Sequence, residues 1–547
     1  SRQYAVSSKQ KAVKKNRFLP TAYFPEVEEK EMKKFLPLTI FCLTVLFPLV
    51  LHAEGVEFQS QMGFLKLSLM DCIEIAFRNN LDVEIARLNP RIEEKDISVA
   101  RARFDPVFKA SGEMRKDEDP FNFLFAAGAF PPRSQSLTYQ KTMDASITSL
   151  VPTGATLSIE YENSRKHLKI NRVTTTSTFI NPFWETAFEA KISQPLLKGG
   201  GVFYNMSPIY IARNDKRKSV YAFRRTLGDV ANATQKAYWG LVKAIEDLKA
   251  AHKSLQRAEE FLHRNKLQVE AGLLASIEVV AAEEEVASRQ EAIIVAENEV
   301  RNKEDNLKQL MNFLSLEADP VLMDITITPL DIPQFLPKKI NLENSLRVAQ
   351  ERRPELFENR LTLENAEITL KQKKNELLPK LDLEGGVRYE GLGNRWHDSQ
   401  ESTLTSDYQG EYAKLTLEIP IGLRAERANY ARARFSLRQA ELELKKIEQD
   451  VLVQVRAAVR QVHTNVERVE ATRKTRELAQ RRLEAEERKF NVGRSTSLEV
   501  LRAQEELTNA ETNESKAITD YQISLGELEA SKGTILEFFG VVIDGEL

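Results

Sequence analysis

The sequence predicts an α+β protein built from a duplicated unit, and three observations lead to this fold class. An export signal lies near the amino terminus, two long stretches of sequence each occur twice, and each copy combines strand-like segments with long segments that lack Gly and Pro. Strands and long helices therefore follow one another within each copy, which is the order expected of an α+β fold rather than of a purely helical one.

The composition excludes several classes of protein. The 547 residues contain 78 Lys and Arg against 80 Asp and Glu, so no overall positive field favours a nucleic-acid partner. The mean hydropathy of −0.39 is unlike that of a protein made of membrane-spanning helices. The two Cys and six His residues lack ligand spacing, and no catalytic motif can be assembled. We therefore predict no enzyme activity and no catalytic, cofactor or metal site.

Residues 32–53 have the order of a secretory signal peptide: two lysines, an apolar stretch, and a cleavage site that ends at Ala53. A short membrane helix is the alternative, but two prolines and the cleavage site favour the signal. We interpret residues 1–31 as an upstream extension outside the fold and expect processing after Ala53. No later apolar run reaches the roughly 18 residues of a membrane helix, so any membrane crossing would use strands.

The chain repeats itself once. A shift of 273 residues aligns 67–112 with 340–385, and a shift of 221 aligns 229–285 with 450–506. The difference of 52 residues between the two shifts places an insertion in the first copy, between the aligned blocks. Two long repeats indicate a duplicated domain rather than a short-period solenoid.

The duplication divides the chain into parts. We predict a first repeat at 54–316, a Pro-rich junction at 317–339, and a second repeat at 340–547. Each repeat is predicted to run helix, strands, long helix, turn, long helix.

Two long helical hairpins are predicted, each turning at a single glycine. In the second copy, Gly493 separates two stretches without Gly or Pro, and Gly272 does the same in the first copy. A helix over 427–490 would be ~95 Å long. Apolar residues recur along it with a period of 11, which favours straight or slightly right-handed packing. These residues are Leu444, Ile447, Val451, Val455, Ala458, Val462 and Val466.

Short segments alternate between apolar and polar residues, as half-buried strands do. The pattern suits either a sheet that covers a core or a transmembrane barrel, and the export signal favours the barrel. The first copy has a further hairpin, with strands 137–150 and 155–162 around Pro152-Thr153-Gly154. The other alternating segments are 108–115, 184–194, 381–391 and 412–421.

The processed chain resembles the TolC-type outer-membrane efflux proteins. The similarity is carried by the two-fold repetition together with four motifs in a fixed order: LSLMDCIEIAFRNNLDVEIARL (67–88), ARARFDPVF (100–108), ISQPLLKGGG (192–201) and RKFNVGRSTSLEVLRAQEEL (488–507).

The resemblance implies a homotrimer. Its protomers would contribute strands to one outer-membrane β-barrel, which contacts outer-membrane lipid, and helices to a long periplasmic coiled-coil tunnel. It further implies a passive exit duct that a periplasmic adaptor protein joins to an inner-membrane transporter. One hairpin from each copy would give four strands per protomer and twelve in the trimer. The further hairpin would either lengthen outer loops or add strands.

Two candidate sites follow from the resemblance. The hairpin tips are expected to contact the adaptor through Gly272, Leu273, Ser276, Gly493, Arg494 and Ser497. A periplasmic gate is expected at Glu278 and Glu499, which are equivalent in the two copies, with Arg502 where the family has a second acid. We expect either hydrogen bonds or contacts of the Glu499–Arg502 kind between helices to hold this gate closed.

Two other functions fit the same patterns. Within the family, the alternative is the outer-membrane component of type I protein secretion. From a different class, the alternative is a soluble periplasmic coiled-coil adaptor or scaffold, which would not be expected to carry two full hairpins and barrel-like strands.

Overall fold

The computed structural model describes residues 63–121, 134–170, 181–314 and 325–541. The predicted signal peptide at 32–53 and extension at 1–31 lie outside the described residues. The described residues all belong to one compact unit, Gln59–Leu547.

The first half of the unit runs from a short strand through two short helices to four strands and a helical hairpin. Its elements are β1 (Phe64–Leu67), α1 (Leu69–Asn79), α2 (Leu81–Ala102), β2 (Val107–Phe121), β3 (Ser134–Leu150), β4 (Thr156–Ile170), β5 (Phe183–Pro195), α3 (Val202–Glu270) and α4 (Ile277–Leu310).

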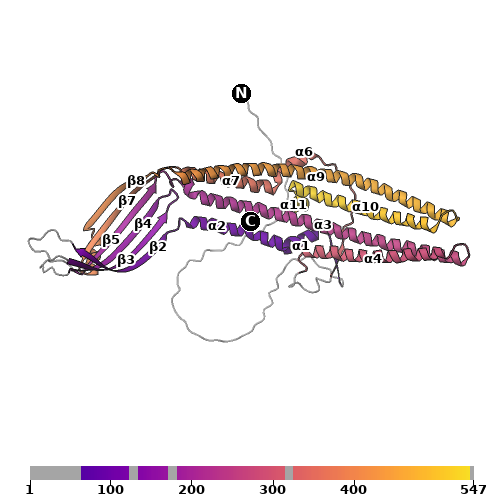
Figure 1. Ribbon diagram of the computed structural model, residues 1–547, viewed down its shortest axis with the longest axis horizontal. Coiled ribbons are helices and arrows are strands. Elements are labelled where there is room, and N and C mark those ends of the chain that lie inside the picture. The colour runs from indigo at the N-terminus through magenta and orange to yellow at the C-terminus, as the bar shows by residue number, and fades with distance from the viewer. Residues whose placement is uncertain (1–62, 122–133, 171–180, 315–324, 542–547) are drawn as a thin grey trace, which may run out of the picture. The chain divides into compact units, whose positions relative to one another are not determined.

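The second half repeats this order with two strands fewer in the sheet. Its elements are β6 (Thr326–Pro329), α6 (Leu342–Arg352), α7 (Pro354–Asn375), β7 (Lys380–Gly393), α8 (Trp396–Leu404), β8 (Tyr408–Glu418), α9 (Arg424–Asn491), α10 (Ser497–Lys532) and α11 (Ile535–Phe538). Figure 1 shows the large sheet at one end of α3 and α9, and both hairpin turns at the opposite end.

Six strands form one antiparallel sheet in the order β2-β3-β4-β5-β7-β8. The expectation of four strands per protomer is therefore wrong, and the open alternative that the further hairpin adds strands is correct. The reason is that β3 and β4 pair with β2 and β5 along their lengths instead of projecting as a loop.

The long helix of the first copy begins earlier than the sequence indicated. The stretch without Gly or Pro starts at residue 241, whereas α3 starts at Val202. Pro208 lies inside α3, where it cannot donate an N–H to the Tyr204 carbonyl, and the Ser207 hydroxyl donates to that carbonyl at 2.7 Å instead. Gly228 and Gly240 also lie within α3. Packing against α2, α4, α7 and α10 outweighs the low helix propensity of these residues.

Both copies begin with a pair of short helices that meet at a sharp corner. In the first copy, the Asn80 side chain accepts hydrogen bonds from the N–H groups of Asp82 and Val83, and so caps α2. In the second copy, Pro354 takes the first position of α7, where its fixed φ suits a helix start. The chain turns sharply at equivalent places, which lets α2 and α7 both pack on α3.

The apolar stripe predicted on 427–490 is the buried face of α9. Val451, Val455 and Val462 are buried, and they pack with Ala517 and Tyr521 of α10. The residues of the period-11 pattern therefore form the interface between the two helices of the second hairpin.

The Pro-rich junction contains a strand that ties the two halves together. β6 pairs in parallel with β1, from the start of the described chain. The Tyr238 hydroxyl of α3 donates to the Asp331 carboxylate at 2.8 Å and also lies near the Leu67 carbonyl. Each of these strands has only four residues, which is too short for alternation of apolar and polar residues to mark it in the sequence.

At Gly526, α10 approaches α3 closely. A Cβ placed there would lie 1.7 Å from the side-chain oxygen of Gln235, which is buried on α3. The amide group of Gln235 donates to the Gln522 carbonyl at 3.0 Å. The two copies are therefore joined by a polar side chain that fits only over a glycine.

We expect Gly526→Ala to lower the free energy of unfolding by about 1–3 kcal/mol, because Gln235 would lose its buried hydrogen bonds. Loss of helical circular dichroism in guanidinium measures the change. Gly240→Ala is the control, since the nearest atom to its Cβ would be Lys303 Cδ at 3.8 Å. Equal stability of the Gly526→Ala variant and the wild type would contradict this account of the crossing.

Candidate functional site

The two hairpin tips have the same backbone structure. Gly272 has a φ of +71° and Gly493 a φ of +70°, a conformation that favours glycine. Gly272 N–H donates to the Val269 carbonyl, and the next residue, Leu273, donates to the Gln268 carbonyl. Gly493 and Arg494 donate in the same way to the carbonyls of Phe490 and Lys489. Both long helices therefore end in a Schellman motif, and the predicted turns are confirmed.

The predicted tip residues differ in their exposure. Gly272, Gly493, Arg494 and Ser276 are exposed, and the Leu273 side chain is 78% exposed. Ser497 is buried, and the Asn265 amide of α3 donates to its hydroxyl at 3.4 Å. The tips thus present a leucine and an arginine outward, whereas Ser497 joins the second hairpin to the first.

The two hairpins pack on each other near their tips. The rings of Phe261 on α3 and Phe490 on α9 lie 5.3 Å apart, within a cluster that includes Val500 and Leu507 of α10. Charged groups join the hairpins above this cluster, where the Arg257 guanidinium lies 3.3 Å from the Glu511 carboxylate. The two tips are therefore held together by both apolar and charged contacts.

The candidate gate residues lie at the starts of the returning helices. Glu278 is in the first turn of α4 and Glu499 in the first turn of α10, next to the positive ends of the helix dipoles. The Arg502 guanidinium lies 3.2 Å from the Glu499 carboxylate, one turn along the same helix. Within the protomer this pair forms inside one helix, because spacing i, i+3 brings both side chains to one face of α10. The expected contacts between helices that would hold the gate closed stay a prediction.

The large sheet has one apolar and one polar face. On the apolar face the side chains are exposed and form a continuous band across all six strands. This band contains Phe108, Met114, Met143, Ile147, Leu157, Ile159, Phe188, Ile192, Leu383, Leu415 and Leu417.

The polar face carries a network of ion pairs between strands. The Arg388 guanidinium of β7 lies 3.1 Å from Glu189 on β5, and Lys191 of β5 lies 2.7 Å from Glu160 on β4. The Tyr412 hydroxyl of β8 is within 3.0 Å of both Glu189 and Glu384. An exposed apolar face opposite a charged face is the pattern of a sheet that separates lipid from water.

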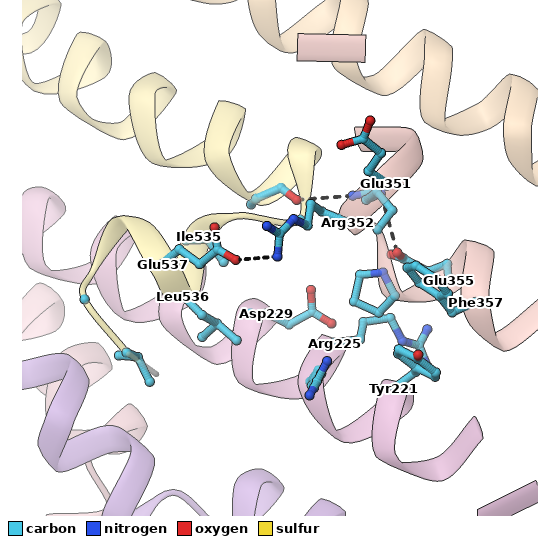
Figure 2. A pocket seen from close by; sticks show the side chains of 18 residues that line it. Tyr221, Arg225, Asp229, Glu351, Arg352, Glu355, Phe357, Ile535, Leu536 and Glu537 are labelled. Atoms are coloured by element: carbon cyan, nitrogen blue, oxygen red, sulfur yellow. Dashed lines mark hydrogen bonds and ion pairs between the residues drawn. The ribbon is translucent and has the colours of Figure 1, made fainter. Parts of the chain in front are cut away.

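A cavity of about 610 Å³ lies between α3, the α6–α7 corner and α11. Figure 2 shows Asp229 and Arg225 of α3 facing this hollow, with Arg352 and Glu537 on its other side joined by an ion pair of 3.0 Å. Burial raises the pKa of Asp229 above its ordinary value, and burial also raises that of Glu358 nearby. The cavity lining therefore includes a carboxylate, that of Asp229, whose anion is less stable than it would be in water.

Among the residues that the structure describes, no three His, Cys, Asp or Glu side chains form a group that could hold a metal ion. None of the helices in the described ranges is both long enough and apolar enough to span a membrane.

Comparison with known proteins agrees with this geometry. A profile of the outer membrane efflux protein family matches residues 154–312 and 346–534. Outer membrane protein TolC of Vibrio cholerae is 25% identical over 305 residues, which cover 55% of this chain and 67% of that relative. TolC of Escherichia coli K12 is 22% identical over 311 residues, which cover 56% of this chain and 61% of that relative.

A solved structure shows the same fold. The outer-membrane channel OprN superimposes with a TM-score of 0.62 at 15% identity, covering 85% of this chain and 90% of that one. The two-faced sheet, the paired hairpins and these matches define an outer-membrane channel with a helical periplasmic part. The chain belongs to the outer membrane efflux protein family. Its location is therefore the outer membrane, and the predicted family, fold class and location are confirmed.

Sequence reasoning missed two features of the site. The cavity is lined by segments from three distant parts of the chain, so no local motif marks it. The contact of Ser497 with Asn265 was also missed, because it depends on how the two hairpins pack. Asp229 carried a weak signal, since it aligns with Asp450 in the second copy.

The raised pKa of Asp229 predicts a pH dependence of stability. Above its folded pKa, the ionised group costs stability, and this cost disappears as the pH falls below the unfolded pKa. We therefore expect Asp229→Asn to raise the thermal midpoint at pH 7 and to lose this advantage toward pH 4. Asp105→Asn, in an exposed loop, is the charge-matched control. An advantage of Asp229→Asn that is the same at both pH values would contradict the prediction.

Proposed function

We propose that the protein is a passive exit duct of a tripartite efflux system, in which three copies form one channel and an adaptor joins it to an inner-membrane transporter. The observation that carries the proposal is the sheet with one apolar face. Within the described residues, β2 and β8 each have one edge without a strand neighbour. Such edges are not stable in hydrocarbon, where every backbone group needs a partner.

A second copy of the chain satisfies these edges. If β8 of one copy pairs with β2 of the next, α9 of the first copy lies beside α2 of the second, because α9 follows β8 and α2 precedes β2. α2 carries a matching stripe of exposed apolar residues with coiled-coil spacing. The stripe consists of Leu81, Ile85, Leu88, Ile92 and Val99, and the exposed apolar residues of α9 include Phe435, Leu442 and Val453.

The duct moves solutes without catalysis in this proposal. Its two repeats, 54–316 and 340–547, would contribute equivalent helical hairpins to the tunnel wall. Type I protein secretion by the same kind of duct is the second candidate, because an open tunnel needs no specific pocket for its cargo. The exposed apolar band of the sheet argues against a soluble adaptor or scaffold, since such a band would aggregate in water.

The adaptor is proposed to contact the exposed part of the tips. Leu273 and Arg494 occupy equivalent positions after the two glycines and project outward, and Ser276 is exposed beside them. An apolar side chain and a cation at neighbouring tips would together suit a hairpin of the adaptor with apolar and acidic residues.

We expect Leu273→Asp combined with Arg494→Asp to weaken adaptor binding by about 2 kcal/mol or roughly thirty-fold, as for other anchoring residues. Photocrosslinking from position 275 to the co-expressed adaptor measures the loss. Ile294→Asp is the matched control, because Ile294 is an exposed apolar residue of α4 away from the tip. Trimers should persist in both variants, and unchanged crosslinking of the double variant would refute the contact.

The gate is proposed at the level of Glu278 and Glu499. Three copies would bring six of these carboxylates around the axis, and a ring of carboxylates in a polar pore favours cations. Arg502 neutralises part of the charge, because its guanidinium already pairs with Glu499. The preference for cations should therefore be modest.

We expect Glu278→Gln with Glu499→Gln to move the single-channel reversal potential in a salt gradient toward zero, since the charges that favour cations are removed. Glu291→Gln, on an exposed face of α4, should leave the potential unchanged. The gate assignment fails if the double variant keeps both the wild-type selectivity and the wild-type closed-state conductance.

A further inference from the structure

The two copies of the repeat contribute different numbers of strands to the sheet. The shift of 273 residues places Val107, the first residue of β2, on Lys380, the first residue of β7. The shift of 221 places β8 on residues 187–197, which overlap β5. In the second copy β7 and β8 pair directly, whereas β3 and β4 separate β2 from β5 in the first copy. The inserted sequence is therefore a hairpin within the wall of the sheet.

The register of the inserted strands keeps the two faces of the sheet intact. One row of paired residues crosses the four strands from β2 to β5 and contains Val107, Thr148, Ser158 and Lys191 in that order. The next row joins Phe108, Ile147, Ile159 and Ala190 on the opposite face. Because two strands are inserted, β2 and β8 also keep opposite directions, so that β8 can pair with β2 of the next copy in antiparallel fashion.

The turn between the inserted strands is fixed at the junction of the sheet and the helices. Gly201 N–H, at the start of α3, donates to the Thr153 carbonyl at 3.0 Å, and the Thr153 and Gln194 side chains are hydrogen-bonded at 2.9 Å. Gly154 has a φ of +94°, and a Cβ there would lie 2.6 Å from the Asn205 amide. The hairpin is therefore anchored at its turn as well as along both strands.

We propose that three copies close an 18-stranded barrel that is wider than the helical tunnel beneath it. The backbone radius would be ~1.5 times that of a twelve-stranded barrel, since diameter grows roughly linearly with strand number. Among the described helices of each copy, α2, α3, α7 and α9 lead from the sheet into the helical part, and α8 only links β7 to β8. The added strands β3 and β4 lie between β2 and β5 in the chain, so they widen the membrane part without adding helices to the tunnel. The inference rests on the proposed trimeric duct.

The wide barrel forms an outer vestibule with a charged inner wall. Glu160, Glu189, Lys191 and Arg388 lie on the face that would line it. The vestibule admits bulky hydrophilic polymers from the exterior as far as the sheet–helix junction, and the narrower tunnel then stops them. Cargo size is consequently limited by the helical part of the duct and not by the barrel.

Labelling of a lumen cysteine with maleimide-polyethylene glycols of graded size tests the width. Lys414→Cys on β8 places the thiol on the polar face, and Ala413→Cys places it on the apolar face as a control. The native Cys72 is buried, and burial raises its pKa to about 12, so it does not compete for the reagent. The comparison variant lacks residues 122–170 and so joins β2 to β5 through residues 171–182.

We expect the introduced thiol of Lys414→Cys in the full chain to react with polymers whose limiting radius is at least ~1.5-fold larger than in the deletion variant. Equal limits in two trimeric proteins would overturn the wide barrel and leave the duct intact. A full chain that is monomeric by native mass spectrometry would overturn the duct itself.

A second measurement does not depend on folding of the deletion variant. In liposomes, Ser146→Cys on the polar face of β3 should react with a water-soluble maleimide, whereas Met143→Cys on the apolar face should react only with a lipid-soluble one. Reaction of both variants with the water-soluble reagent would place the hairpin outside the wall and refute the inference.

Discussion

The two unpaired edges of the six-stranded sheet impose the constraint on which the rest of the structure depends. β2 and β8 both leave a row of backbone N–H and C=O groups without strand partners in the described part of one protomer. In hydrocarbon each such group costs several kcal/mol, and the exposed apolar band places the sheet there. Closure by further copies is thus required by the backbone. The helices attached to the edge strands must then meet across the same seam.

The helical part is organised by contacts between the two hairpins instead of by charge repulsion. Two carboxylates ~10 Å apart in water repel by only ~0.4 kcal/mol before screening, which is too little to set the state of a tunnel. The ring contact of Phe261 with Phe490 and the bond of Asn265 to Ser497 hold the tips of one protomer together. Any opening of the tunnel therefore moves the hairpins as a pair or breaks these contacts.

The duplication has preserved the helical plan and let the sheet diverge. Both hairpins end in the same glycine motif, and both pairs of short helices turn at equivalent corners. The first copy gained β3 and β4, whereas the second has α8 between β7 and β8, where Thr186 and Gly391 contact Ser399 and Thr403. These changes leave the helical plan intact, because β3, β4 and α8 each lie between strands of the sheet in the chain and not between a strand and a long helix.

The elements that could be predicted from the sequence are those whose signals are local. Periodicity identified the buried face of α9, single glycines identified both tips, and alternation identified the strands, because each depends on side chains a few residues apart. The features that needed the folded chain depend on partners distant in sequence. The pairing of β3 with β2, the burial of Ser497 and the cavity around Asp229 all require contacts between segments far apart in the chain. Glu499 and Arg502 combine a local and a structural signal. Their spacing places them on one face of a helix, and the structure shows that the two side chains pair within α10.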